Sequence, residues 1–263
     1  MQFIDTHCHL DLLANYNQTV LNAHKNGVSD LICPSLGANF DKVWQICKSS
    51  QHIYMALGIY PSPSKIPAYQ KLPKDLLDKM HIYLENLEYR KQIVAIGECG
   101  LDFTRVSSES EKQIQIDLFT SQIMLANKYR LPMILHTRGT GEIVLDLVLK
   151  YKLKKAVFHS FSGSKKLAKK IIDAGYYLGV GGLMTVETGL QKILKEVDLK
   201  YLVLETDAPY LIPKPFKGKV AYNEPRYIPD IAKILADVKQ LSLAEIAERT
   251  TLNAQQLFSK LIV

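Results

Sequence analysis

Six side chains of the kinds that bind divalent metals stand near the ends of short apolar runs in this sequence. They are His7, His9, Glu98, His136, His159 and Asp207. A strand of a buried parallel sheet reads as a continuous apolar run because both of its faces are covered, so polar side chains at its end need an explanation. Imidazole and carboxylate ligands suit Zn²⁺, Mn²⁺ or iron, and sites completed by water also hold Mg²⁺. The pattern predicts a metal site and leaves the metal open.

The spacing of the first two histidines fits this chemistry. Side chains alternate between the two faces of a strand, so His7 and His9 should point to one side and Cys8 to the other. Two imidazoles at positions i and i+2 can bind one ion, and we expect the thiol to pack as a small apolar group. The remaining histidines fall in helical or pre-strand segments, where we expect surface or structural roles: His24, His52 and His81.

The elements that must position these residues alternate along the chain. Apolar or β-branched runs predict eight strands, at 3–9, 30–34, 54–59, 93–98, 133–136, 156–159, 176–180 and 202–207. Segments of helical periodicity lie at 15–26, 39–49, 74–90, 109–129, 141–150, 164–174, 187–197, 225–238 and 243–260. Pro225 suits a first helical turn, and Ser242 with Glu245 forms a capping-box pattern.

This alternation predicts a parallel α/β fold, and the count of eight favours a closed (β/α)8 TIM barrel of the metal-dependent hydrolase type over an open doubly wound sheet. We expect a single domain over residues 1–263, since no low-complexity linker divides the chain. The C-terminal ends of barrel strands meet at one mouth, where active sites of this fold lie. The six candidate ligands should therefore meet in one small volume.

Composition restricts the class of protein. The chain has 263 residues, 47% of them hydrophobic, which excludes disordered and collagen-like classes. The net charge of +7 suits either a polyanionic partner or a basic soluble enzyme. Four cysteines without a C-x-x-C pair indicate reduced thiols and a cytoplasmic location. A signal-peptide pattern and a membrane-spanning apolar run are both missing, so we expect no membrane association. We also expect a monomer.

Six short motifs carry a resemblance to a known family. They are FIDTHCHL (3–10), IGECGLD (96–102), LHTR (135–138), FHSFSGS (158–164), ETDAPYL (205–211) and NEP (223–225). In this order they resemble the TatD family of metal-dependent deoxyribonucleases, from residue 3 to about 258. The resemblance implies an amidohydrolase-type barrel with two divalent metal ions per chain, Mg, Mn or Zn. It also implies DNA as the partner, with phosphodiester hydrolysis that is commonly 3′→5′ exonucleolytic on single strands.

The resemblance further implies a role for each ligand. The first metal would be held by His7, His9 and Asp207, the second by His136 and His159, and Glu98 would bridge both. Two metals ~3.5–4 Å apart lower the pKa of bound water toward ~7 and stabilise the attacking and leaving oxygens. Asp207 is the best candidate to orient or deprotonate the water, so we expect catalytic roles for Asp207 and Glu98.

Three further carboxylates lie close to these ligands in the sequence. Glu205 shares the strand parity of Asp207 and could order a metal ligand from the second shell or form a buried ion pair. Asp5 and Asp11 flank the histidine pair, so they could orient its rings or occupy a turn or cap.

Substrate-binding candidates follow the strand ends. Arg138 stands where a bidentate phosphate contact is natural, and Ser160 and Ser162 could donate to phosphate from the loop before a helix. Lys217 belongs to a basic loop, residues 214–219, which suits a nucleic-acid backbone. Aromatic side chains available for base stacking are Tyr210, Phe161 and Phe103.

The chain departs from the family's usual pattern in three places. Tyr60 stands where a phosphate-contacting histidine is common, and it offers a neutral hydroxyl or a stacking face instead. Residues 139–141 read GTG where an acidic residue and alanine are common, and Ala221-Tyr222 replace a basic residue before NEP. These departures bear on substrate preference, and none removes a metal ligand.

Two other functions compete with the nuclease. A hydrolase of the same barrel class could act on a small ester, lactone or amide, although Glu98 in place of a bridging lysine and the loop 214–219 favour the nuclease. A non-catalytic nucleic-acid-binding or scaffold protein would bear the desolvation cost of six buried ligands without using them. DNA versus RNA preference and exonuclease versus endonuclease mode stay open.

Overall fold

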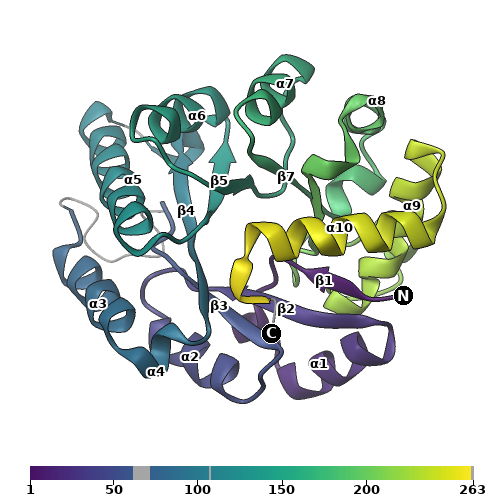
Figure 1. The fold of residues 1–263 in the computed structure, drawn as a ribbon, viewed down its shortest axis with the longest axis horizontal. Coiled ribbons are helices and arrows are strands. Elements are labelled where there is room, and N and C mark those ends of the chain that lie inside the picture. Colours follow the sequence, from purple (N-terminus) through teal and green to yellow (C-terminus); the bar gives the residue numbers. More distant parts are fainter. Residues whose placement is uncertain (62–71, 107, 262–263) are drawn as a thin grey trace.

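The computed structural model describes residues 1–61, 72–106 and 108–261. Its eight parallel strands are hydrogen-bonded in the order of the sequence, from the first to the eighth (Figure 1). The strands are β1 (Phe3–Asp5), β2 (Val28–Pro34), β3 (Ile53–Leu57), β4 (Ile93–Asp102), β5 (Met133–Arg138), β6 (Ala156–Phe158), β7 (Tyr177–Val180) and β8 (Leu202–Leu204).

Contacts between the first and the last strand close the sheet. The Thr6 N–H group donates to the Leu204 carbonyl at 3.0 Å, and the Asp207 N–H group donates to the His7 carbonyl at 2.8 Å. Every strand thus has neighbours on both sides, and the predicted (β/α)8 barrel is confirmed.

Helices surround this barrel (Figure 1). They are α1 (Tyr16–Lys25), α2 (Phe40–Lys48), α3 (Lys74–Glu85), α4 (Leu87–Arg90), α5 (Glu109–Tyr129), α6 (Gly141–Lys150), α7 (Lys165–Asp173), α8 (Thr188–Glu196), α9 (Ile228–Lys239) and α10 (Leu243–Leu257). No helix within the described ranges is long and apolar enough to cross a membrane.

Several boundaries differ from the sequence prediction, and β1 and β8 end earlier than predicted, at Asp5 and Leu204. The helix expected at 74–90 is two helices, because Asn86 has extended backbone and its side chain caps α4 by accepting from the Glu88 N–H group at 2.8 Å. Pro225 opens a separate 3-10 turn, and α9 begins after it. Strand β4 continues beyond Glu98, so this residue lies inside a strand rather than at its end.

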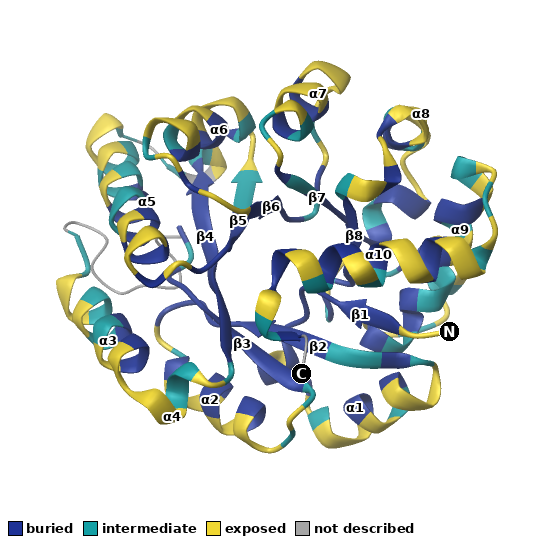
Figure 2. Ribbon diagram, in the orientation of Figure 1, coloured by how far each residue is buried: buried dark blue, intermediate teal, exposed yellow. Residues whose placement is uncertain are grey.

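Helix α10 covers the end of the barrel where the strands begin, and it crosses the foreground of Figure 2. A buried apolar cluster fills this end of the interior. Its members are Ile4, Ile32, Tyr54, Ala56, Val94, Ala95, Ile134, Val157 and Val203 from the strand region, and Ala254, Leu257, Phe258 and Leu261 from the C-terminal segment. Asn253 fixes the helix by donating to the carbonyls of Leu199 and Leu202 at 2.8 and 2.7 Å. The site must therefore open at the opposite end.

Gly100 lies where a side chain cannot fit. Its φ of +148° is unfavourable for other residues, and a Cβ there would lie 2.1 Å from the His136 carbonyl oxygen on β5. We expect Gly100→Ala to lower the free energy of unfolding by about 3 kcal/mol, because β4 and β5 must separate to admit the methyl group. Chemical denaturation measures this. Gly218→Ala is the matched control, since Gly218 has φ +78° and no neighbour within 4 Å of its added Cβ. Equal losses for both variants would contradict the close-approach argument.

Candidate metal centre

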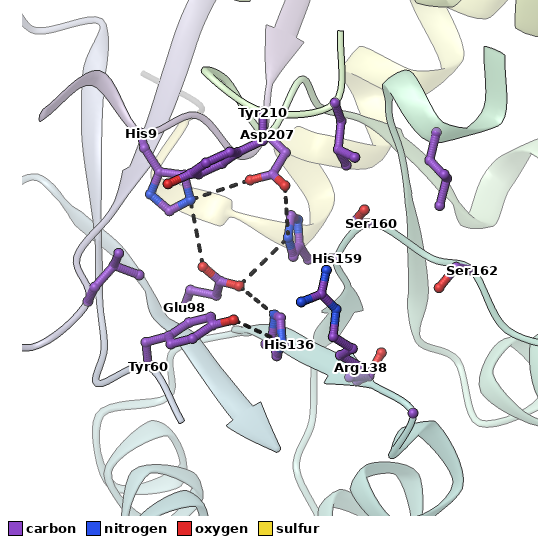
Figure 3. Close-up of a pocket in the computed structure, with 15 residues that line it drawn as sticks. His9, Tyr60, Glu98, His136, Arg138, His159, Ser160, Ser162, Asp207 and Tyr210 are labelled. Atoms are coloured by element: carbon purple, nitrogen blue, oxygen red, sulfur yellow. Dashed lines mark hydrogen bonds and ion pairs between the residues drawn. The ribbon is translucent and has the colours of Figure 1, made fainter. Parts of the chain in front are cut away.

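The first group of predicted ligands, of which Figure 3 labels His9, Glu98 and Asp207, faces a common point at the C-terminal end of the barrel. His7 Nε2 and His9 Nε2 lie 3.2 Å apart. Asp207 Oδ1 lies 3.6 Å from the first of these atoms and 3.4 Å from the second. Glu98 Oε2 lies 3.5 and 3.7 Å from them. Four potential ligand atoms, from β4 and from the segments after β1 and β8, thus surround one position.

A second group shares the same glutamate. Glu98 Oε1 lies 2.8 Å from His136 Nδ1 and 3.7 Å from His159 Nε2. Asp207 reaches this group with its other oxygen, since Oδ2 lies 4.0 Å from His159 Nε2. The two oxygens of Glu98 therefore face different groups, as a bridging carboxylate requires.

The alternation predicted for the first ligands persists beyond β1. The strand itself ends at Asp5, yet the rings of His7 and His9 meet on one side. The Cys8 thiol is fully buried on the other side, where it lies 3.7 Å from the Ile32 carbonyl oxygen.

The electrostatics of the centre suit a bound cation. Burial, together with the neighbouring His159, lowers the pKa of His7, which keeps that imidazole neutral as a ligand must be. Burial acts to raise the pKa of Glu98, but hydrogen bonds from His136 and His7 outweigh it and hold the pKa well below its usual value. Burial likewise opposes ionisation of Asp207, and the histidines again lower its pKa. Two carboxylates that remain ionised, beside the neutral imidazole of His7, form part of a donor set that fits a divalent metal.

The backbone turns sharply after the strands that carry His159 and Asp207. Ser160 and Asp207 have φ of 46° and 57°, a left-handed conformation that residues other than glycine rarely adopt. Asn223 holds the second turn by donating to the Thr206 carbonyl at 2.8 Å. Strain of this kind persists only where surrounding contacts impose it, and here it places Asp207 over the centre.

Glu205 contacts a candidate ligand directly. Its Oε1 lies 3.0 Å from His159 Nδ1 and accepts from the Ser160 N–H group at 2.5 Å. Burial acts to lower the pKa of His159, but the charges of Glu205 and Asp207 raise it to about 10. Gly179 leaves the room for this carboxylate, since a Cβ there would lie 2.3 Å from Glu205 Oε2.

Of the two roles open for Asp5 and Asp11, orienting the imidazole rings or occupying a turn or cap, their hydrogen bonds do not include the rings. Asp5 Oδ1 accepts from the N–H groups of Thr206 and His7 at 3.0 and 3.2 Å, and Oδ2 accepts from the Thr206 hydroxyl at 2.6 Å. Burial outweighs these bonds and raises its pKa to about 8. Asp11 Oδ2 accepts from Asn39 Nδ2 at 2.9 Å. Asp5 thus joins β1 to the segment after β8, and Asp11 occupies the turn.

The sequence analysis did not single out Asp102. Its Oδ2 lies 3.4 Å from His136 Nε2, and although burial acts to raise its pKa, the hydrogen bonds of His136 and Thr104 lower it to about 2. The Tyr60 hydroxyl lies 3.2 Å from the same nitrogen. Asp102 lies four residues after Glu98 on β4, so the alternation of side chains along a strand predicts that both point to the same face. The contacts of Tyr60 are with a candidate ligand rather than with open solvent.

A cavity of about 650 Å³ opens above the centre. Arg138, Ser160, Ser162 and Tyr60 line it, as Figure 3 shows, and the Arg138 guanidinium extends toward the ligand group. The cavity wall also includes side chains that the sequence analysis did not name: Leu36, Leu183, Leu211 and Thr137.

Lys217 and two of the stacking candidates are placed differently. Lys217 is exposed and is not among the residues of the cavity wall. In the same loop the Phe216 ring stacks on the Tyr227 ring, with 4.1 Å between the ring centres. Phe161 is 3% exposed and cannot stack on a base, so that expectation was wrong. Phe103 is half-buried and lies outside the wall, whereas Tyr210 lines it and is 47% exposed.

Comparison with known proteins agrees with this geometry. The family described as TatD related DNase matches residues 4–259. The chain belongs to the TatD family. The predicted resemblance and enzyme class, a metal-dependent hydrolase, are therefore confirmed.

Similar TatD proteins occur in bacteria and animals. The chain is 32% identical to "Uncharacterized metal-dependent hydrolase YabD" of Bacillus subtilis, over 97% of this chain and 98% of that protein. It is 32% identical to human "Deoxyribonuclease TATDN3", over 98% and 95%. The crystal structure of the TatD homologue YjjV from Escherichia coli superposes with a TM-score of 0.87 at 30% identity, covering 98% of both chains.

Proposed function

We propose that this TatD hydrolase cleaves phosphodiester bonds of DNA, as a 3′→5′ exonuclease on single strands, with two divalent ions held in the candidate metal centre. The observation that carries the proposal is the position of Glu98, whose two oxygens face two separate groups of imidazole ligands. The human relative named as a deoxyribonuclease supports DNA as the substrate. A monomer in the cytoplasm stays a prediction.

Two divalent ions would supply positive charge to the phosphoryl oxygens and activate a water molecule. His7, His9 and Asp207 would hold one ion, and His136 and His159 the other. Glu98 would hold both. Asp207 would also accept a proton from the attacking water, since its carboxylate lies at the wall of the cavity and its lowered pKa keeps it ionised.

Other residues of the cavity would position the substrate. Arg138 would bind a non-bridging phosphate oxygen with its guanidinium, and Ser160 and Ser162 offer hydroxyl donors on the same side. Tyr210 presents a half-exposed ring on which the terminal base could stack. Glu205 would keep the His159 ring in place through Nδ1.

The decisive experiment supplies the purified protein with Mg²⁺, Mn²⁺ or Zn²⁺ and a 5′-labelled single-stranded oligonucleotide. The proposal expects a ladder that shortens from the 3′ end, release of mononucleotides, and complete loss of both with EDTA. Internal cuts would agree with nuclease activity but would overturn the exonuclease mode. Intact DNA together with cleavage of a small lactone, amide or phosphotriester would assign the centre to small-molecule hydrolysis instead.

Arg138→Gln tests the proposed phosphate contact. We expect KM for DNA to rise by about 10-fold or more, because a charge-assisted bond to phosphate contributes roughly 1.5–3 kcal/mol. The turnover number should change less, since a guanidinium group is a cation and does not bind the metal. Arg138→Lys keeps the charge and loses the bidentate geometry, so its KM should lie between those of the wild type and Arg138→Gln. An unchanged KM in steady-state assays would remove Arg138 from the substrate site.

A further inference from the structure

The positive charge of the chain gathers at the barrel end that α10 covers, opposite the cavity. Three connecting stretches, 89–92, 127–132 and 149–156, lead into β4, β5 and β6. Together they carry eight lysine and arginine residues and no aspartate or glutamate. These residues, here named the basic rim, are Arg90, Lys91, Lys128, Arg130, Lys150, Lys152, Lys154 and Lys155. The sequence alone had suggested the loops around the mouth as one location of the charge.

Direct contacts join the three stretches into one surface. Arg90 Nη2 donates to the Tyr129 carbonyl at 3.3 Å, and its guanidinium carbon lies 5.2 Å from the centre of the Tyr129 ring. Lys128 Nζ lies 4.9 Å from the same ring centre. Asn127 Nδ2 donates to the Tyr151 carbonyl at 2.8 Å, which links the second stretch to the third. The basic rim is therefore continuous in space although its parts are distant in sequence.

Carboxylates neutralise little of this charge. Within the described ranges, Lys128 is the one member of the basic rim in ion-pair contact with a carboxylate, at 3.6 Å from Glu85 Oε1. Lysines elsewhere are paired more fully. On α7 the pairs are Lys165–Glu196 at 2.5 Å, Lys169–Asp173 at 2.9 Å and Lys170–Glu142 at 2.5 Å. Ion pairs with carboxylates are therefore common among the lysines of α7 and rare in the basic rim.

Some basic residues of this region have unfavourable backbone conformations, and one buried ammonium group lies close to them. Arg130 and Lys152 have φ of 54° and 55°, at helix ends where glycine or asparagine is favoured. The ammonium group of Lys260 lies beneath the rim and donates to the carbonyls of Arg90 and Ile93. Its burial, to which the Arg90 charge adds, lowers its pKa to about 8. An anionic partner would offset the self-repulsion of such a group of cations.

We propose that the basic rim binds the phosphate backbone of a nucleic-acid strand at the end of the barrel opposite the cavity. Seven members are exposed and Arg90 is half-buried, so lysine and arginine heads are available to several phosphates at once. A membrane surface would bind more strongly with neighbouring apolar side chains that insert. Leu149 is the one leucine of the three stretches that is exposed, since Leu131 and Leu153 are buried.

The separation of the two surfaces sets a length requirement. Strand β4 begins at Ile93, next to the basic rim, and reaches Glu98 after five residue steps, which at ~3.3 Å per residue is about 17 Å. A nucleic-acid strand that advances ~3.4 Å per nucleotide needs at least about 5 nucleotides to cover this distance. Shorter oligonucleotides should contact one surface at a time, and longer ones should gain affinity by contacting both.

Two variants with the same change in net charge test the proposal. The rim variant is K91Q/R130Q/K152Q/K154Q, which neutralises four exposed members. The control variant is K165Q/K166Q/K169Q/K170Q on α7, which removes the same number of charges. Fluorescence anisotropy in EDTA, where hydrolysis is stopped, measures the affinity of each protein for a labelled single strand of about 30 nucleotides over a range of salt concentrations. Hydrolysis of a small chromogenic phosphodiester, measured separately with metal, reports whether each variant is intact.

We expect the rim variant to bind at least ~10-fold more weakly, with a salt slope lowered by up to about 3, while the control variant stays within about 2-fold of the wild type. Equal weakening by both variants, or no weakening by the rim variant, would overturn the proposal. So would rim-dependent binding to anionic lipid vesicles without binding to the oligonucleotide. Because binding is measured without catalysis, failure of DNA hydrolysis would overturn the proposed function and leave this result standing.

Discussion

Glu98→Gln is expected to reduce DNA hydrolysis by about 10³-fold or more while the barrel stays folded. The glutamate is 3% exposed and offers one oxygen to the pair His7 and His9 and the other to His136 and His159. The amide keeps the size of the side chain but presents one neutral oxygen, so it cannot bridge two cations. Several kcal/mol of transition-state stabilisation that the ions supply would be lost.

Two further measurements separate loss of metal from loss of fold. Metal analysis of purified Glu98→Gln should show fewer bound ions per chain than the wild type, and its circular dichroism spectrum should be unchanged. Glu142→Gln on α6 is the matched control, because Glu142 is an exposed glutamate that pairs with Lys170. A Glu98→Gln enzyme with wild-type activity would exclude the bridging role, whatever its metal content.

The sequence predicted the barrel and the ligand group because one physical rule governs both. Buried parallel strands are apolar, so the polar residues His136, His159 and Asp207 were visible as interruptions, and parallel strands bring such interruptions to one end. Glu98 was found although its strand continues beyond it. The alternation rule also held for His7 and His9 beyond the last residue of β1, where backbone pairing to the segment after β8 keeps the chain extended.

Contacts that depend on strand register were not predictable. The spacing from Glu98 predicts the face to which Asp102 points, but its partner depends on how β4 pairs with β5, where a register shift between Ile96 and Cys99 has no signal in the sequence. The basic rim was missed for a related reason. Its three stretches are separated by whole helices and strands, and they become neighbours through the order of β4, β5 and β6.

The break at Asn86 and the position of Lys217 show a second limit. Helical periodicity continued across Asn86, so the capping contact that divides the helix was hidden by the apolar pattern on either side of it. Lys217 follows β8, which leads to the mouth of the barrel. The position of its loop depends on contacts within and around the loop, here the stacking of the Phe216 ring on the Tyr227 ring. The sequence thus predicts at which end of the barrel a loop residue lies, but not whether that residue lines the cavity.

Asp5→Ala should lower the free energy of unfolding by about 3–4 kcal/mol, more than any change at the cavity wall. The side chain is fully buried and accepts three hydrogen bonds, from the His7 N–H group and from the N–H and hydroxyl groups of Thr206. Alanine would leave these donors without an acceptor in the seam that closes the barrel, and each buried, unpaired donor costs about 1–3 kcal/mol. Urea denaturation of the metal-free protein measures the loss without a contribution from ligand binding.

Asp5→Asn distinguishes this account from a simple effect of cavity size. Asparagine keeps Oδ1 as an acceptor for the two N–H groups, and the Thr206 hydroxyl can rotate to accept from the new amide. The expected loss is therefore about 1 kcal/mol, well below that of alanine. If the two variants lost equal stability, acceptance of hydrogen bonds by Asp5 Oδ1 would not be what stabilises the seam between β1 and β8. Because His7 follows Asp5 by two residues on the same strand end, the alanine variant should also bind metal more weakly, in proportion to the loss of order in that segment.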